Sequence, residues 1–212
     1  MSVETNRMTG VLLAGGKSRR MGQDKRFLEL AGQTLLERAL SRLEPLFADI
    51  LVVVAEPDPQ LASLRHAVVT DLIPGCATLG GLYTGLSLAR HPRVFACACD
   101  MPFLDRAVIE RMIQLGQGAD VVMAELASGL QPMHAIYSKA CLPHLERMAR
   151  ANQFKVQELA TETALAVRLV RESELVDVDP RFLSFLNINT QADLEFARKL
   201  LAERRTNPGG KA

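Results

Sequence analysis

The segment from Leu13 to Lys25 holds the residues whose types and spacing could do chemistry. It reads LAGGKSRRMGQDK, with three glycines, and it follows an apolar stretch. Lysines and arginines occupy positions 17, 19, 20, 25 and 26, although the whole chain has a net charge of +1. Glycines let the backbone present its N–H groups at close range, and cations neutralise phosphate oxygens. The pattern predicts a triphosphate-binding loop, with a solvated basic surface loop as the alternative.

Two familiar phosphate loops do not fit this segment. A Walker A loop would end at Gly16-Lys17-Ser18, but its first glycine would fall on Val11. A dinucleotide fingerprint needs G-x-G-x-x-G, whereas the glycines here stand at positions 15, 16 and 22. A P-loop NTPase and a nicotinamide-dependent oxidoreductase are therefore both disfavoured.

Two carboxylates follow apolar runs elsewhere in the chain. Asp100 comes directly after the run 95–99, and Asp71 closes the run 68–70. Ligands of doubly wound sheets bind outside the carboxyl ends of the strands. A carboxylate at such a position can bind Mg²⁺ that bridges phosphate oxygens. The alternative for Asp100 is a turn or helix-capping residue, and for Asp71 it is a plain turn.

The elements that must position these residues alternate along the chain. Strands are expected at 10–14, 50–55, 67–70, 94–99, 119–124, 134–137 and 165–170, and helices at 34–47, 79–89, 104–115 and 139–149. A last helix follows Thr190, which forms a capping-box pattern with Asp193. The alternation predicts an α/β fold with a doubly wound, mostly parallel sheet and helices on both faces. One domain is expected over 1–212, with its core at about 9–203 and a disordered tail at 206–212.

Composition excludes several classes of protein. The near-neutral charge of the 212 residues disfavours a nucleic-acid binder, and no apolar run approaches the length of a membrane span. Because the first seven residues are polar and the next apolar run is short, a signal peptide is not expected and the cytoplasm is. The cysteines at 76, 97, 99 and 141 include no C-x-x-C pair, so we expect reduced thiols rather than a disulfide framework or a zinc site.

Three motifs together resemble the molybdenum cofactor guanylyltransferases, which belong to the sugar-phosphate-type nucleotidyltransferases. They are L-A-G-G-x-S-x-R-M-G-x-D-K at 13–25, C-D-M-P-F-L at 99–104 and N-I-N-T at 187–190. The resemblance extends from about residue 9 to about residue 203. It implies a Rossmann-like nucleotidyltransferase fold and transfer of GMP from GTP to molybdenum-bearing molybdopterin, with release of pyrophosphate. The terminal phosphate of molybdopterin would attack the α-phosphorus in line, without a covalent enzyme intermediate.

The resemblance also assigns roles to residues. The residues implied in nucleotide binding are Leu13, Ala14, Gly15, Gly16, Gly22, Lys25, Asp71, Gly81 and Asp100. Those implied in catalysis are Lys25, Arg20 and Asp100, of which Asp100 would bind Mg²⁺. On the acceptor side, the resemblance implies Asn187 and Asn189. His134 could line the acceptor pocket, but a packed, hydrogen-bonded histidine is the preferred interpretation.

One departure from the family pattern bears on the choice of base. Relatives usually have Gly-Pro-Leu where this chain has Ala77-Thr78-Leu79, in a loop that the family uses near the nucleobase. A molybdopterin cytidylyltransferase, or another small nucleotidyltransferase, is therefore an alternative. A nucleotide-binding regulatory module without catalysis is a second alternative, which the presence of both Lys25 and Asp100 disfavours. GTP and molybdopterin are the expected small-molecule partners, molybdoenzymes are possible recipients, and a monomer or weak oligomer is expected.

Overall fold

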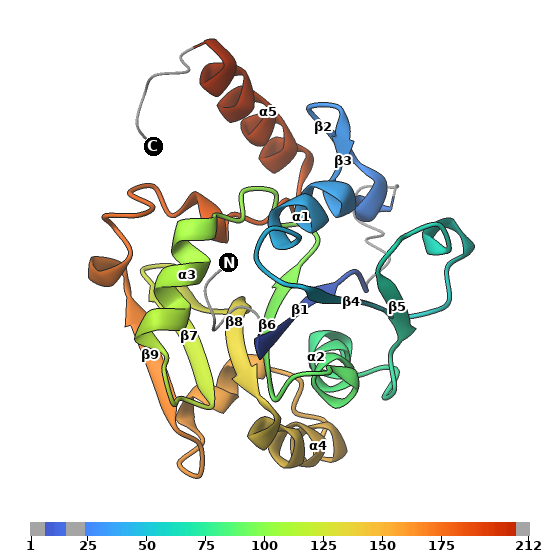
Figure 1. Cartoon of the computed structure of the whole chain (residues 1–212), viewed down its shortest axis with the longest axis vertical. Helices are drawn as coiled ribbons and strands as arrows, with labels where there is room; N and C mark the ends of the chain where they lie inside the picture. The colour runs from blue at the N-terminus through green and yellow to red at the C-terminus, as the bar shows by residue number, and fades with distance from the viewer. Residues whose placement is uncertain (1–6, 16–23, 207–212) are drawn as a thin grey trace.

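A seven-stranded sheet forms the centre of the protein (Figure 1). The computed structural model describes residues 7–15 and 24–206, and the side chains of these residues up to 203. The strand order is β5-β4-β1-β6-β8-β7-β9, and β8 alone among these strands runs against its neighbours. The strands are β1 Met8–Leu13, β4 Asp49–Val54, β5 Ala67–Thr70, β6 Arg93–Ala98, β7 Val121–Leu126, β8 Gly129–Ser138 and β9 Val167–Arg171.

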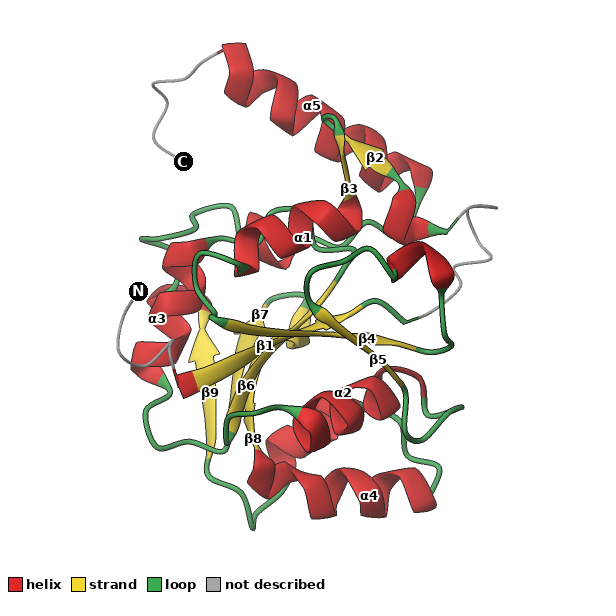
Figure 2. Cartoon of the chain, turned by 45° about the vertical axis from the view of Figure 1, so that its right-hand side comes forward, coloured by secondary structure: helices red, strands yellow, loops and turns green. Residues whose placement is uncertain are grey.

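Helices cover both faces of the sheet, as the sequence predicts (Figure 2). Helices α1 (Leu35–Leu43) and α3 (Arg106–Leu115) lie on one face, and α2 (Ala77–Leu88) and α4 (Leu142–Arg150) lie on the other. Short 3₁₀ turns complete the connections at Lys25–Phe27, Pro59–Leu61, Lys139–Cys141, Val156–Thr161, Glu172–Glu174 and Leu183–Phe185. No helix within the described residues is long and apolar enough to cross a membrane.

The sheet separates two hydrophobic clusters, because alternate side chains of a strand point to opposite faces. In β1, Leu12 packs with α1 and α3, whereas Val11 and Leu13 pack with α2 and α4. Helix α2 lies unusually close to β1. A Cβ atom placed on Gly85 would stand 2.5 Å from Val11 Cγ1, so the glycine sets the separation of helix and strand. Nearer the start of α2, a Cβ atom on Gly81 would stand 3.2 Å from Leu13 at the end of β1, so the start of the helix lies beside the end of the strand.

A third cluster lies beyond the end of the sheet and joins segments that are distant in sequence. It contains the short hairpin of β2 (Glu29–Leu30) and β3 (Gln33–Thr34), together with α5 (Gln191–Thr206). Figure 1 shows α5 beside this hairpin. Its buried members are Leu28, Leu30, Leu35, Phe103, Leu183, Ile188, Leu194, Ala197 and Leu200. The hairpin was not expected from the sequence, because each of its strands has only two residues.

Most expected elements are present, with shifted ends. The helix expected over 34–47 ends at Leu43, and a capping box between Thr34 and Glu37 starts it. Thr190 and Asp193 form the expected reciprocal bonds before α5: the Asp193 amide donates to Thr190 Oγ1 and the Thr190 amide to the Asp193 carboxylate. Residue 206, expected in the tail, is the last residue of α5, and 207–212 lie outside the described residues. All four cysteines are free, and Cys76 is half-buried whereas the other three are buried.

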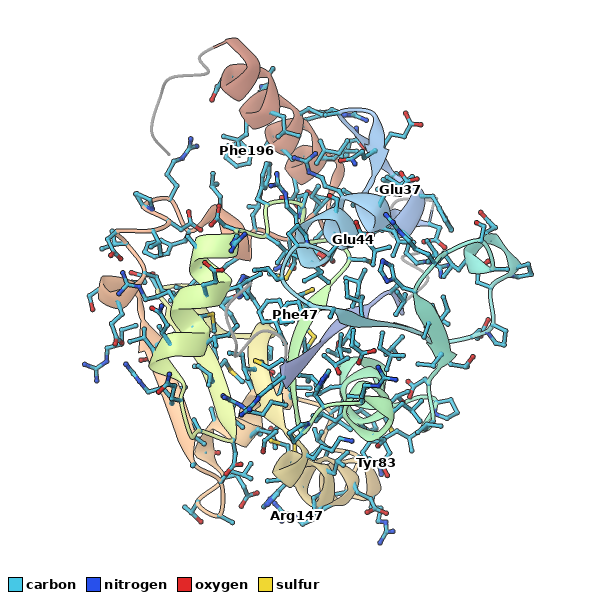
Figure 3. All side chains as sticks on the ribbon, in the orientation of Figure 1. Glu37, Glu44, Phe47, Tyr83, Arg147 and Phe196 are labelled. Atoms are coloured by element: carbon cyan, nitrogen blue, oxygen red, sulfur yellow. The ribbon has the colours of Figure 1, made fainter. Side chains whose placement is uncertain are left out.

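His134 is a packed core histidine, which confirms the preferred interpretation. It is fully buried on β8, between Phe95 and Phe185, with ring centroids 5.1 and 4.4 Å away. Phe95 in turn stacks on Phe47, which is labelled in Figure 3. His134 Nε2 lies 2.9 Å from Ser184 Oγ, and Nδ1 has no hydrogen-bond partner among the described residues. Burial lowers the pKa of His134 to about 3, so the ring is neutral near pH 7.

This burial predicts a loss of stability in mild acid. The ordinary imidazole pKa is 6.5, so between pH 6.5 and about 3 the unfolded chain binds a proton that the folded chain excludes. The contribution of the neutral His134 to the free energy of unfolding should be fully present above pH 6.5. The free energy of unfolding should fall by up to about 5 kcal/mol as the pH drops through this window. The His134→Gln variant keeps a polar group near the Nε2 position but does not titrate. Urea unfolding from pH 7.5 to 4 should show a shallower pH slope for the variant; equal slopes would contradict the prediction.

Candidate active site

A cavity of about 720 Å³ opens at the carboxyl ends of β5, β4, β1 and β6. Doubly wound sheets bind their ligands at this edge. Because β8 runs antiparallel to β6, its amino-terminal end reaches the same edge and closes one side of the cavity. The lining residues are Leu13, Gly15, Val53, Val54, Ala55, Glu56, Asp71, Pro74, Gly75, Ala77, Thr78, Gly81, Ala98, Asp100, Met101, Gln131, Pro132, Met133, Asn187 and Asn189.

Asp100 lies two residues after the end of β6 and lines the cavity. Its Oδ1 atom is buried and has no hydrogen-bond partner among the described residues. Burial raises the pKa of the Asp100 carboxyl, and the nearby Lys25 ammonium acts in the opposite direction. A buried carboxylate oxygen without a partner costs free energy, and a bound cation would remove that cost.

Lys25 brings a cation to this carboxylate from the loop after β1. Its Nζ atom stands 3.7 Å from Asp100 Oδ2 and donates a hydrogen bond of 2.9 Å to Asn189 Oδ1. The lysine side chain is only 14% exposed, so the ammonium is held near one place rather than free in solvent. Three segments that are far apart in the sequence thus supply a cation, a carboxylate and an amide within hydrogen-bonding or ion-pair distance.

A backbone hydrogen bond places the two asparagines. The Ile188 amide donates to the Asp100 carbonyl at 2.8 Å, which joins the segment before α5 to the end of β6. The Ile188 side chain is fully buried in the third cluster, and its two neighbours, Asn187 and Asn189, line the cavity. Phe103 of the same cluster stands three residues after Asp100. Burial of Ile188 and Phe103 in the third cluster therefore positions the neighbouring residues that line the cavity.

Arg26, one of the five cations counted in the basic cluster, is held in ion pairs within the protein. Its guanidinium pairs with the carboxylates of Asp24 and Asp58 at 2.5 and 2.6 Å. These partners raise the pKa of Arg26, the Asp24 hydrogen bond most strongly. Arg26 is buried and is not among the residues that line the cavity. The two ion pairs fix the end of the loop just after Lys25, which restricts where the lysine can reach.

Asp71 stabilises the part of the cavity next to β5 through hydrogen bonds. Its Oδ1 atom accepts hydrogen bonds from the Ile73 amide at 3.1 Å and the Thr84 hydroxyl at 3.0 Å. A Cβ atom on Gly80 would stand 2.5 Å from Asp71 Oδ2, so only glycine allows this approach. Asp71 therefore shapes the loop after β5. It also lines the cavity, where a bound ligand could contact it. The start of α2 faces the same space through Ala77, whose φ of 51° is one that glycine adopts more readily.

The structure brings together most of the residues that the sequence singles out. Those that line the cavity are Leu13, Gly15, Asp71, Gly81, Asp100, Asn187 and Asn189. Lys25 contacts two of them. Ala14 is buried, and its amide donates to the Val53 carbonyl at 2.8 Å, so that N–H group is already bonded. Gly16, Arg20 and Gly22 lie outside the described residues, and their implied roles stay predictions.

Sequence reasoning missed the wall formed by Gln131, Pro132 and Met133. These residues precede the strand expected over 134–137, and a lone proline within a strand-like run usually indicates an edge or a turn. The available signal was this Gln-Pro pair close to a buried run. Whether the Gln-Pro pair lies at the cavity depends on which end of β8 reaches the cavity, and this follows only from the antiparallel pairing with β6.

Comparison with known proteins identifies the family. Residues 10–165 match the family model described as a MobA-like NTP transferase domain. The molybdenum cofactor guanylyltransferase of Desulfosudis oleivorans is 36% identical over 200 residues, which cover 93% of this chain and 98% of the relative. The crystal structure of molybdopterin-guanine dinucleotide biosynthesis protein A from Archaeoglobus fulgidus has a TM-score of 0.80 and 26% identity, and covers 92% and 100% of the two chains.

The same fold occurs in a more distant protein that was crystallised with a metal. A Mycobacterium tuberculosis protein in complex with manganese matches with a TM-score of 0.67 at 18% identity, covering 92% of this chain and 99% of that one. At this identity the match shows the shared fold alone.

The placement of the site by the third cluster can be tested with two isoleucines. Ile188→Ala and Ile113→Ala each remove a buried side chain, and each should lower the free energy of unfolding by about 2–5 kcal/mol. Ile113 packs in the cluster around α3, away from the cavity. Only Ile188→Ala should also slow nucleotidyl transfer, by about tenfold or more, because small displacements of reacting groups are costly. Turnover is measured at a temperature where both variants are folded; equal rates would contradict the prediction.

Proposed function

We propose how the residues of this chain, which belongs to the MobA-like NTP transferase family and is a molybdenum cofactor guanylyltransferase, carry out its reaction. The enzyme transfers GMP from GTP to molybdenum-bearing molybdopterin and releases pyrophosphate. The observation that carries the proposal is the contact of Lys25 with Asp100 and Asn189, two residues that line the cavity at the carboxyl end of β6. The comparisons assign the reaction, and the roles of individual residues are our inference.

The cavity has two ends, and the strand order suggests which substrate each end binds. The nucleoside end is formed by Asp71, Ala77 and Thr78, next to β5 and β4. The opposite end lies next to β8 and consists of Met101 and the wall at 131–133. Asp100 follows β6, which lies between β4 and β8 in the strand order, and Lys25 contacts both Asp100 and Asn189. We assign the middle to the reacting phosphates and the β8 end to the acceptor.

Asp100 fits a magnesium ion. Mg²⁺ prefers oxygen ligands and is commonly held by one or two carboxylates together with substrate phosphates and water. Asp100 offers a buried oxygen without a partner among the described residues, and these residues hold no cluster of three or more histidines, cysteines or acidic side chains. One carboxylate beside a phosphate site therefore suits Mg²⁺ better than a metal that needs a cage of protein ligands. When bound, Mg²⁺ supplies positive charge to the phosphate oxygens.

The side chains of the chain act by position and charge. Lys25 neutralises charge that develops on the phosphates during displacement, and Asn189 holds the ammonium in place through its 2.9 Å hydrogen bond. Asn187 lines the cavity together with Asn189 and orients the attacking phosphate of the acceptor. In-line attack at the α-phosphorus of GTP forms the new P–O bond while the bond to pyrophosphate breaks. No nucleophilic side chain is required.

Removal of the charge at Asp100 should abolish most metal-dependent turnover. Asn keeps the shape of the side chain but lacks the charge that a hard divalent cation requires. The Asp100→Asn variant should therefore be at least about a hundredfold slower at all Mg²⁺ concentrations while remaining folded, with circular dichroism as the folding control. Asp105→Asn is a matched control, because Asp105 caps α3 and does not line the cavity. Wild-type rates for Asp100→Asn would reduce the carboxylate to a turn residue.

The enzyme should prefer GTP over CTP and ATP. Guanine carries N1–H and N2–H₂ donors, and Asp71 at the nucleoside end offers carboxylate oxygens. A wrong base leaves such groups unpaired at about 1–3 kcal/mol each, so discrimination in kcat/KM should be roughly tenfold or more. Competition between equal GTP and CTP, with mass spectrometry of the dinucleotide product, measures this preference. A majority of cytosine product would favour the cytidylyltransferase alternative, which the Ala77-Thr78 departure motivates.

The proposal has four further parts. The metal is Mg²⁺, and the product is passed to molybdoenzymes. The protein is cytoplasmic, and it is a monomer or a weak oligomer. The dinucleotide product is a cofactor, so the enzymes that receive it are molybdenum-dependent enzymes. Size-exclusion chromatography with light scattering tests the oligomeric state.

A further inference from the structure

The wall at the β8 end of the cavity is an irregular part of the sheet. In the pairing of β7 with β8, Met123 is opposite Ala135 but Ala124 is opposite Gln131. Residues 132–134 of β8 therefore have no counterpart on β7 and form a bulge. Bulges often lie beside active sites, where they redirect side chains. Proline suits this position because it has no N–H group to leave unpaired.

A buried tyrosine fixes the shape of this bulge. The Tyr137 hydroxyl donates a hydrogen bond of 2.7 Å to the Pro132 carbonyl, five residues earlier in the same strand. In a regular strand, residues five apart are about 17 Å apart, which is beyond the reach of a tyrosine side chain. The bond therefore requires the folded-back path of the bulge. Tyr137 is fully buried and does not line the cavity, so it can act on a ligand only through Pro132.

The residues on the bulge suit a flat heterocycle with an amide-like edge. Pro132 and Met133, with Met101 beside them, give the cavity apolar surfaces at this end. A methionine sulfur packs well against aromatic rings. Gln131 adds a carboxamide whose N–H group donates to Ser128 Oγ at 3.2 Å and to the Gly129 carbonyl at 3.0 Å. Its oxygen accepts no hydrogen bond from the residues that the structure describes. The pterin part of the acceptor presents N–H donors along one edge, which such an oxygen would accept.

We propose that Gln131, Pro132 and Met133 form the wall that recognises the pterin of the acceptor, with Gln131 as a specificity-determining residue and Tyr137 as a positioning residue. This proposal rests on the proposed function, because it assigns the acceptor to the β8 end of the cavity. The nucleoside end, more than one strand away in the order β4-β1-β6-β8, should not depend on this wall.

The first test uses the two tyrosines of the chain. Tyr137→Phe keeps the ring and removes the hydroxyl, so the KM for molybdopterin should rise about fivefold, as expected for one hydrogen bond. GTP affinity by calorimetry and kcat at saturating acceptor should stay within about twofold. Tyr83→Phe is the matched control, because Tyr83 lies on α2 (Figure 3) and is not among the residues that line the cavity. It should leave all three quantities unchanged.

The second test separates recognition by Gln131 from its role in the local turn. Gln131→Met keeps the size of the side chain and should raise the KM for molybdopterin about tenfold with unchanged GTP affinity. Ser128→Ala removes one of the turn bonds of Gln131 without touching the cavity lining, and should change neither constant. Unchanged acceptor KM in both Tyr137→Phe and Gln131→Met, or an equal effect of Ser128→Ala, would overturn the inference. A wild-type enzyme that forms no dinucleotide would instead overturn the proposed function.

Discussion

The hydrogen bond from the Ile188 amide to the Asp100 carbonyl connects the parts on which the site depends. It joins the end of β6 to the segment before α5, and the Ile188 side chain anchors that segment in the third cluster. Lys25 reaches the same place from the loop after β1, whose end is held by the Arg26 ion pairs. A cation, a carboxylate and an amide thus meet because apolar residues behind them are buried together, not because they are close in sequence.

The arrangement of the sheet gives the cavity the two ends that we assign to the two substrates. Parallel strands bring the ends of β5, β4, β1 and β6 to one edge, and the antiparallel β8 adds its own beginning to that edge. The nucleoside end is shaped by close packing, in which Gly80 lets Asp71 approach α2. The acceptor end is shaped by a bulge with apolar side chains. In the proposed mechanism the reacting groups meet between the two ends, so both substrates approach one set of charges.

The sequence predicted the parts of the fold that depend on strong local patterns. Long apolar runs predicted the buried strands, and the Thr190–Asp193 capping pattern predicted the start of α5. The two-residue strands of the β2–β3 hairpin were missed because they carry no periodicity, and the bulge at Pro132 was missed because it depends on pairing with β7. The sequence counted Arg26 in the basic cluster without a separate role, because a run of cations does not show which of them has a carboxylate partner. Asp100 and Lys25 were identified through a motif, but Asn189 as the partner of Lys25 is a tertiary contact that only the structure provides.

We propose that Lys25 and Asn189 act on the triphosphate as one unit. Calorimetric GTP affinities of Lys25→Ala, Asn189→Ala and the double variant, with Mg²⁺ present, test it most directly. Lys25→Ala should weaken binding roughly ten- to a hundredfold, and Asn189→Ala should weaken it less. If Asn189 acts by holding the ammonium, the double variant should bind about as weakly as Lys25→Ala alone, with a coupling energy of about 1 kcal/mol or more. Additive losses, or unchanged affinity in Lys25→Ala, would contradict the account.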